Sequence, residues 1–130
     1  MTARTFRRIA GCFILVAASS NAPVGAAQTD IVGPLGSNAF GSTVTVLANG
    51  NIVVTDPNYA LNNVGAVYLY SPSGVQIGML TGSTKNDHVG SGGVVALDNG
   101  NFIVASPLWA NATTANAGAV TWVDGANGLS

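Results

Sequence analysis

The sequence VTVLANGNIVVTDPNYA, residues 44–60, recurs without a gap as VVALDNGNFIVASPLWA, residues 94–110, at an offset of 50. Eight of the seventeen paired positions hold the same residue. Further along, GAV at 65–67 recurs at 118–120, and the three extra residues fall in the Asn- and Thr-rich stretch 111–117. Insertions of this kind belong in loops. The chain is therefore predicted to hold two copies of one structural unit.

Each unit is predicted to be a series of short strands. In the first unit they are expected at residues 43–47, 52–54, 65–70 and 75–80, where apolar residues alternate or run together and Gly, Pro and Ser interrupt them. Between the first two strands stand Asn49-Gly50, and Asn99-Gly100 in the second unit. These pairs predict type I′ hairpin turns with positive φ at both residues. No helical periodicity occurs beyond the N-terminal segment, so the protein is expected to be all-β.

Four strands in about 50 residues is the unit of a β-propeller blade. A β-solenoid is the alternative, but it would need two coils per repeat. We expect about two four-stranded blades, the second incomplete after its third strand near Val123, in an open fragment because two blades cannot close a ring. IVGPLG at 31–36 resembles IGMLTG at 77–82 and predicts a stray fourth strand. The expected divisions are 28–39 for this leading segment, 40–87 for the first repeat and 88–130 for the truncated second.

The first 27 residues have the pattern of a secretory signal peptide. Arg4, Arg7 and Arg8 precede the ten-residue apolar run 9–18, and small residues before Ala26 and Ala27 favour cleavage after either of them. The run is too short to span a bilayer. A buried N-terminal helix, a twin-arginine signal and a lipid anchor at Cys12 are alternatives that fit the flanking residues less well. The protein is expected to be secreted, to the cell surface, the periplasm or the medium.

Composition argues against several functions. Charged residues are 7% of the chain, and beyond the first eight residues they are one cation, Lys85, and five aspartates. Nucleic-acid binding requires clusters of basic residues, which this composition lacks. One His and no Glu leave few groups for acid–base catalysis. Asp87-His88 with Ser91 matches no triad spacing, so a polar loop between blades is expected there. We therefore expect a protein that is not an enzyme and has no cofactor.

Three stretches of the first unit carry a resemblance to a known family: FGSTV at 40–44, NGNIVVTDP at 49–57 and GAVYLY at 65–70. Together they resemble an FG-GAP blade, the repeat of integrin α-subunit propellers. The second unit is similar to repeats of secreted bacterial arrays, and the resemblance covers residues 40–128. The family often binds calcium through an Asp-rich loop, but the corresponding turns 48–51 and 98–101 hold one Asp at most. No calcium site is expected here, because calcium needs several carboxylate oxygens.

Large aromatic residues are the candidate binding residues. Tyr59 and Trp109 occupy equivalent positions in the two repeats, and Trp122 lies in the last expected strand. They either pack between neighbouring blades or form a platform for a sugar or a protein on one face. The sequence predicts an exported, non-catalytic module for binding, adhesion or surface scaffolding, with an unknown protein or carbohydrate ligand. An accessory propeller fragment of a larger secreted enzyme and a purely structural spacer are the alternatives. Exposed strand edges predict self-association or pairing with further repeats.

Overall fold

The computed structural model describes residue 25 and residues 27–129. This part of the chain consists of seven strands without a helix: β1 (Val44–Val46), β2 (Ile52–Asp56), β3 (Ala66–Tyr70), β4 (Gln76–Thr81), β5 (Val94–Ala96), β6 (Phe102–Ser106) and β7 (Ala119–Val123). The signal segment lies almost entirely in residues 1–24 and 26, outside the described part. Within the described residues, no helix could cross a bilayer.

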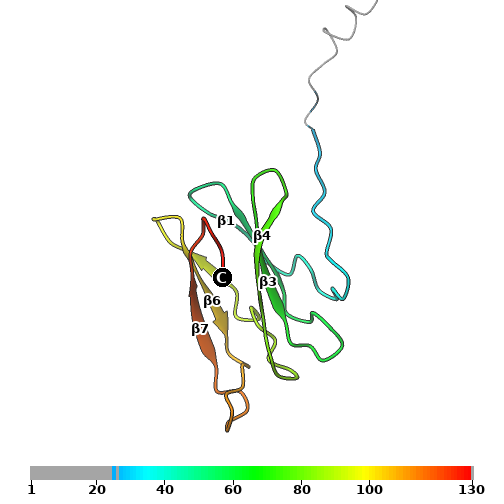
Figure 1. Ribbon diagram of the computed structural model, residues 1–130, viewed down its shortest axis with the longest axis vertical. Coiled ribbons are helices and arrows are strands. Elements are labelled where there is room, and N and C mark those ends of the chain that lie inside the picture. Colours follow the sequence, from blue (N-terminus) through cyan, green and yellow to red (C-terminus); the bar gives the residue numbers. More distant parts are fainter. Residues whose placement is uncertain (1–24, 26, 130) are drawn as a thin grey trace, which may run out of the picture.

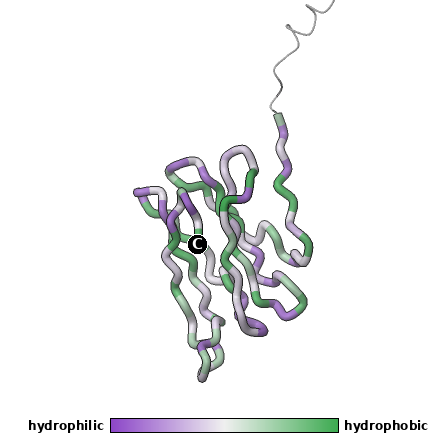
Figure 2. The backbone as a smooth tube through the Cα atoms, in the orientation of Figure 1, coloured by the Kyte–Doolittle hydropathy of each residue, from purple (hydrophilic) through white to green (hydrophobic). Residues whose placement is uncertain are grey.

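The strands form two antiparallel sheets, one per repeat. The first sheet has four strands in the order β1-β2-β3-β4, and the second has three in the order β5-β6-β7. The sheets stand beside each other and, over the described residues, do not close into a barrel (Figure 1). The hydrophobic stretches follow the strands, while the loops between them mix hydrophilic and hydrophobic residues (Figure 2). The expected all-β repeat architecture, an open pair of blades with the second lacking its fourth strand, is confirmed.

The two sheets pack through different faces. In the first sheet, we call the face that carries Val53, Val67 and Leu69 the forward face. In the second sheet, the forward face carries the repeat equivalents of these residues, Ile103, Val120 and Trp122. The opposite face of each sheet is the rear face. Cross-strand partners such as Val53–Leu69 and Ile103–Trp122 lie directly opposite each other and therefore share a face.

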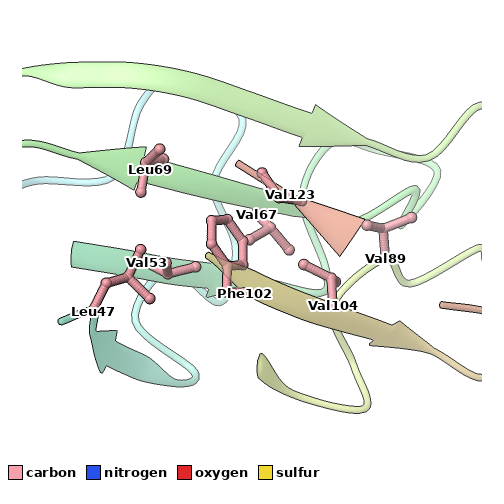
Figure 3. Packing of buried hydrophobic residues seen from close by; sticks show 8 residues of the cluster. All are labelled: Leu47, Val53, Val67, Leu69, Val89, Phe102, Val104 and Val123. Atoms are coloured by element: carbon pink, nitrogen blue, oxygen red, sulfur yellow. The ribbon is translucent and has the colours of Figure 1, made fainter. Parts of the chain in front are cut away.

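The forward face of the first sheet lies against the rear face of the second. The core between them, shown in Figure 3, buries eight residues: Leu47, Val53, Val67, Leu69, Val89, Phe102, Val104 and Val123. Non-equivalent surfaces thus meet, as they do between successive units of a repeat array. Burial of this aliphatic surface holds the two repeats together.

The rear face of the first sheet has its own smaller core. Tyr68 and Tyr70 are buried there, and Phe40 covers them with ring centroids 5.4 and 6.3 Å away. Ile31 packs on the same cluster. The segment before β1 therefore covers a face that a preceding sheet would otherwise cover.

The predicted stray strand at residues 31–36 is wrong. The segment is irregular and turns at Leu35 and Gly36. Pro34 has no N–H to give to a ladder, and Ile31 instead packs its side chain on the rear face. Hydrophobic contact with the sheet, rather than strand pairing, fixes the segment.

The hairpin turns differ in type from the prediction. Gly50 and Gly100 both have φ of +87°, as expected, but Asn49 and Asn99 do not have positive φ. The N–H of Leu47 donates to the Asn51 carbonyl and that of Gly50 to the Leu47 carbonyl. Three residues, not two, thus form the loop, with glycine in the left-handed region at its end. The glycine requirement remains, and the type I′ assignment is corrected.

Candidate functional site

The three aromatic residues singled out in the sequence lie at three different places. Tyr59 packs edge-on against Tyr68 on the rear face of the first sheet, with ring centroids 6.2 Å apart. Trp109 is partly buried against the core between the sheets. Trp122, in β7, is 56% exposed on the forward face of the second sheet. Tyr59 and Trp109 therefore serve packing, and only Trp122 is placed for contact with another molecule.

The forward face of the second sheet is an exposed apolar surface. Val120 and Trp122, on the edge strand β7, are 73% and 56% exposed, whereas their equivalents Val67 and Leu69 are 3% and 2% exposed. On β5, at the other edge of the sheet, Val95 is 59% exposed on the same face. Equivalent positions are thus buried in the first repeat and exposed in the second.

An open groove adjoins this surface. Its volume is about 370 Å³, and it is lined by Gly92, Ala105, Ser106, Pro107, Gly118, Ala119 and Val120. Ser106 is the one polar residue among them, and none carries a charge. A face of this composition is suited to apolar contact with a protein surface.

Asparagine side chains from the hairpin turns join the two repeats at one end of the sheets. The side-chain amides of Asn49 and Asn51 both donate to the Gly125 carbonyl, at 3.0 and 2.7 Å. The Gly125 N–H in turn donates to Oδ1 of Asn101, at 3.0 Å. A Cβ on Gly125 would overlap the Gly100 carbonyl oxygen, so the turn must be glycine to approach so closely. We call this contact the asparagine clasp.

The clasp involves residues that the sequence prediction missed. The NG pair alone does not indicate Asn51 and Asn101, but the recurrence of the full NGN string in both repeats does. In the second repeat, Asn99 Oδ1 accepts the Asn101 N–H at 3.1 Å, as Asn49 Oδ1 accepts that of Asn51. The side-chain amide of Asn99 has no hydrogen-bond partner among the described residues. The turn of the second repeat thus presents an exposed copy of the donor that Asn49 uses.

The polar loop before β5 joins the repeats at the opposite end. Oδ2 of buried Asp87 accepts the N–H groups of Ser83 and Thr84 at 3.0 and 2.8 Å, and its Oδ1 accepts that of Ala110 at 3.0 Å. His88 Nδ1 lies 2.9 Å from the Pro57 carbonyl oxygen in the first repeat. Both side chains are engaged with the backbone. Asp87 and His88, which do not match a catalytic triad in the sequence, thus make structural hydrogen bonds in this loop.

A second buried carboxylate is that of Asp56, the last residue of β2, on the rear face of the first sheet. Its Oδ1 accepts the Ala39 N–H at 2.8 Å, while Asp56 Oδ2, Ser37 Oγ and Tyr68 Oη are buried without a hydrogen-bond partner. Burial raises the pKa of Tyr68 to about 12, and the Asp56 charge adds to the rise. The phenol is therefore protonated at neutral pH. In the described part of the chain, no three His, Cys, Asp or Glu side chains gather as a metal site would require.

Comparison with known proteins gives one match. The profile of a protein family described as a repeat of unknown function (DUF5650) matches residues 96–130, which span β6 and β7 of the second repeat. No curated protein and no solved structure matches the chain. The second repeat is thus similar to a recognised repeat, which supports the repeat character of the protein.

Proposed function

We propose that this protein is an exported, non-catalytic β-repeat module for binding, adhesion or surface scaffolding, built from blades of the FG-GAP type. The observation that carries the proposal is the exposed forward face of the second sheet. Trp122, Val120 and Val95 stand on it together, beside an uncharged groove. An apolar sheet face of this kind is typical of an interaction surface in an exported module.

A protein partner fits this face better than a carbohydrate does. Of the three candidate aromatics, Tyr59 and Trp109 are engaged in packing, which leaves Trp122 alone on the face. The groove beside it has few polar groups to hydrogen-bond sugar hydroxyls. Apolar contact, by contrast, needs only the exposed Val and Trp side chains.

Adhesion to cells of the producing organism tests the proposal. The full chain is expected to bind the cell surface saturably, and Val120→Glu is expected to weaken that binding at least about tenfold, since it places a charge in the apolar contact. Leu61→Glu is the matched control, because Leu61 is fully exposed in the loop between β2 and β3, outside this face. Its binding should equal that of the unchanged chain.

A carbohydrate ligand would give a different result. Soluble polysaccharides would then change the tryptophan fluorescence saturably, and Trp122→Ala would abolish the change. Equal binding by Val120→Glu and the unchanged chain would contradict the proposed face.

Export is the second part of the proposal, supported by the basic and apolar pattern of residues 1–27. N-terminal sequencing of material collected outside the cytoplasm is expected to begin at Ala27 or Gln28. Exported protein that still begins at Met1, or that carries lipid on Cys12, would contradict cleavage by a signal peptidase at this position.

The accessory-propeller and spacer alternatives differ from the main proposal in what accompanies the repeats. A catalytic domain in the same reading frame would favour the accessory role. The lack of catalysis is supported by the engagement of Asp87 and His88 in hydrogen bonds to the backbone. The spacer alternative predicts that Val120→Glu has no effect on adhesion.

A further inference from the structure

The forward face of the second sheet repeats, position by position, a surface that this protein already uses for docking. In the first repeat, Leu47, Val53, Val67 and Leu69 are buried against the second sheet. Their equivalents Leu97, Ile103, Val120 and Trp122 line the face that has no sheet against it. The polar part recurs as well, since exposed Asn99 stands where Asn49 donates to the neighbouring repeat.

The structure also shows what packs on the forward face of the first sheet. It is the rear face of a repeat, with Phe102, Val104 and Val123 at its centre. Close approach requires Gly90, where a Cβ would lie 2.6 Å from Val67 Cγ2. Gly125 also lies at this contact, where a Cβ would lie 2.8 Å from Leu47 Cδ1 of the first repeat.

We propose that the forward face of the second sheet is a docking surface for a partner β-sheet repeat of the same kind, which presents its rear face with glycines equivalent to Gly90 and Gly125. The inference names the partner of the proposed binding function and rests on it. The partner's apolar rear-face residues would cover Val120 and Trp122, and its turn carbonyl would accept a hydrogen bond from the Asn99 amide.

A second copy of this chain is a poorer occupant. The rear face of its second sheet is already buried against its own first sheet. The rear face of its first sheet is covered by Phe40, which stands at the position equivalent to Gly90 and packs on Tyr68 and Tyr70. Within the described residues, the first repeat thus has a cover on its outer face, whereas the forward face of the second repeat is exposed.

A tandem extension of the chain supplies such a partner at high effective concentration. The turn after β7, residues 124–128, is one residue longer than its equivalent, 71–74. When the turn glycines Gly128 and Gly74 are aligned, Ser130 corresponds to Gln76, so residues 77–130 are appended directly after it. The added segment brings a fourth strand for the second sheet and a third sheet with the required rear face. The matched variants carry Val120→Glu or Leu61→Glu in the original part, and all three chains have the same number of tryptophans.

The extended chain is expected to unfold at least about 5 °C above the extended Val120→Glu variant, in a single transition. Its tryptophans should also be quenched less by acrylamide, because docking covers Trp122. Extended Leu61→Glu should match the extended chain in both measurements. These readouts do not involve export or adhesion, so they can fail independently of the proposed function.

Equal unfolding temperatures and equal quenching for the extended chain and its Val120→Glu variant would overturn the proposal. So would an appended repeat that unfolds separately at low temperature. Sedimentation of the unextended chain gives an independent check on the occupant. If it forms dimers that Val120→Glu dissociates, the face binds a second copy and the proposal is wrong.

Discussion

Gly65→Ala is expected to destabilise the protein by about 3 kcal/mol or more. Gly65 has φ of +79°, where a Cβ is strained by about 1–2 kcal/mol. It also lies where the two repeats cross, pairing with Val89 in an isolated bridge. A Cβ there would overlap the Val89 nitrogen and lie 2.6 Å from the His88 carbonyl carbon. Backbone atoms cannot rotate away as a side chain can, so the two sheets would have to separate.

The repeat itself offers the control for this experiment. Gly118 is the equivalent of Gly65 and has φ of +80°, but a Cβ on it would lie 3.5 Å from its nearest neighbour, the Pro107 carbonyl oxygen. Gly118→Ala should therefore cost only the conformational strain, about 1–2 kcal/mol. Urea denaturation measures both variants. Equal losses would show that the crossing of the repeats is not a close backbone contact.

Asp87→Ala is expected to cost about 3 kcal/mol. The substitution removes the acceptor of three backbone N–H groups, two in its own loop and one at Ala110 beyond β6. Hydrogen bonds to a charged acceptor are stronger than neutral ones, and a partly buried N–H without a partner is costly. Water can reach the exposed loop at Ser83 and Thr84, which keeps the estimate below the sum of three such bonds.

Asp87→Asn should lose about half as much stability, because its single carbonyl oxygen can still accept from one side of the site. Asp98→Ala is the control, since Asp98 is exposed in a turn, and a change within about 0.5 kcal/mol is expected. Thermal unfolding of the three variants compares them directly. An Asp87→Ala loss no larger than that of Asp98→Ala would show that the carboxylate does not hold this loop.

The strands and the repeat were predictable because they depend on local patterns. The apolar run 52–54 and the GAV strings at 65 and 118 specify strands wherever the rest of the chain goes. The glycines of the turns were predictable too, since few other residues adopt positive φ. The turn type was not, because it depends on the pairing of Leu47 with Asn51 across the hairpin.

The errors concern contacts between distant parts of the chain. Residues 31–36 share a pattern with a true strand, but whether they pair depends on a neighbour that the pattern does not contain. The asparagine clasp joins residues 74 and 76 positions apart, which no local signal reports. Trp109 and Trp122 were indistinguishable as large aromatics in adjacent segments. Only the packing of forward on rear face separates the buried ring from the exposed one.

The two repeats are held together by contacts at both ends of their strands. The asparagine clasp closes the end near Ile52, and the Gly65–Val89 bridge with the Asp87 loop closes the end near Asp56, with an aliphatic core between them. A joint held in this way cannot bend like a hinge without breaking buried contacts. The two blades should therefore move as a single stiff body, which keeps a fixed angle under load and carries tension from one end to the other.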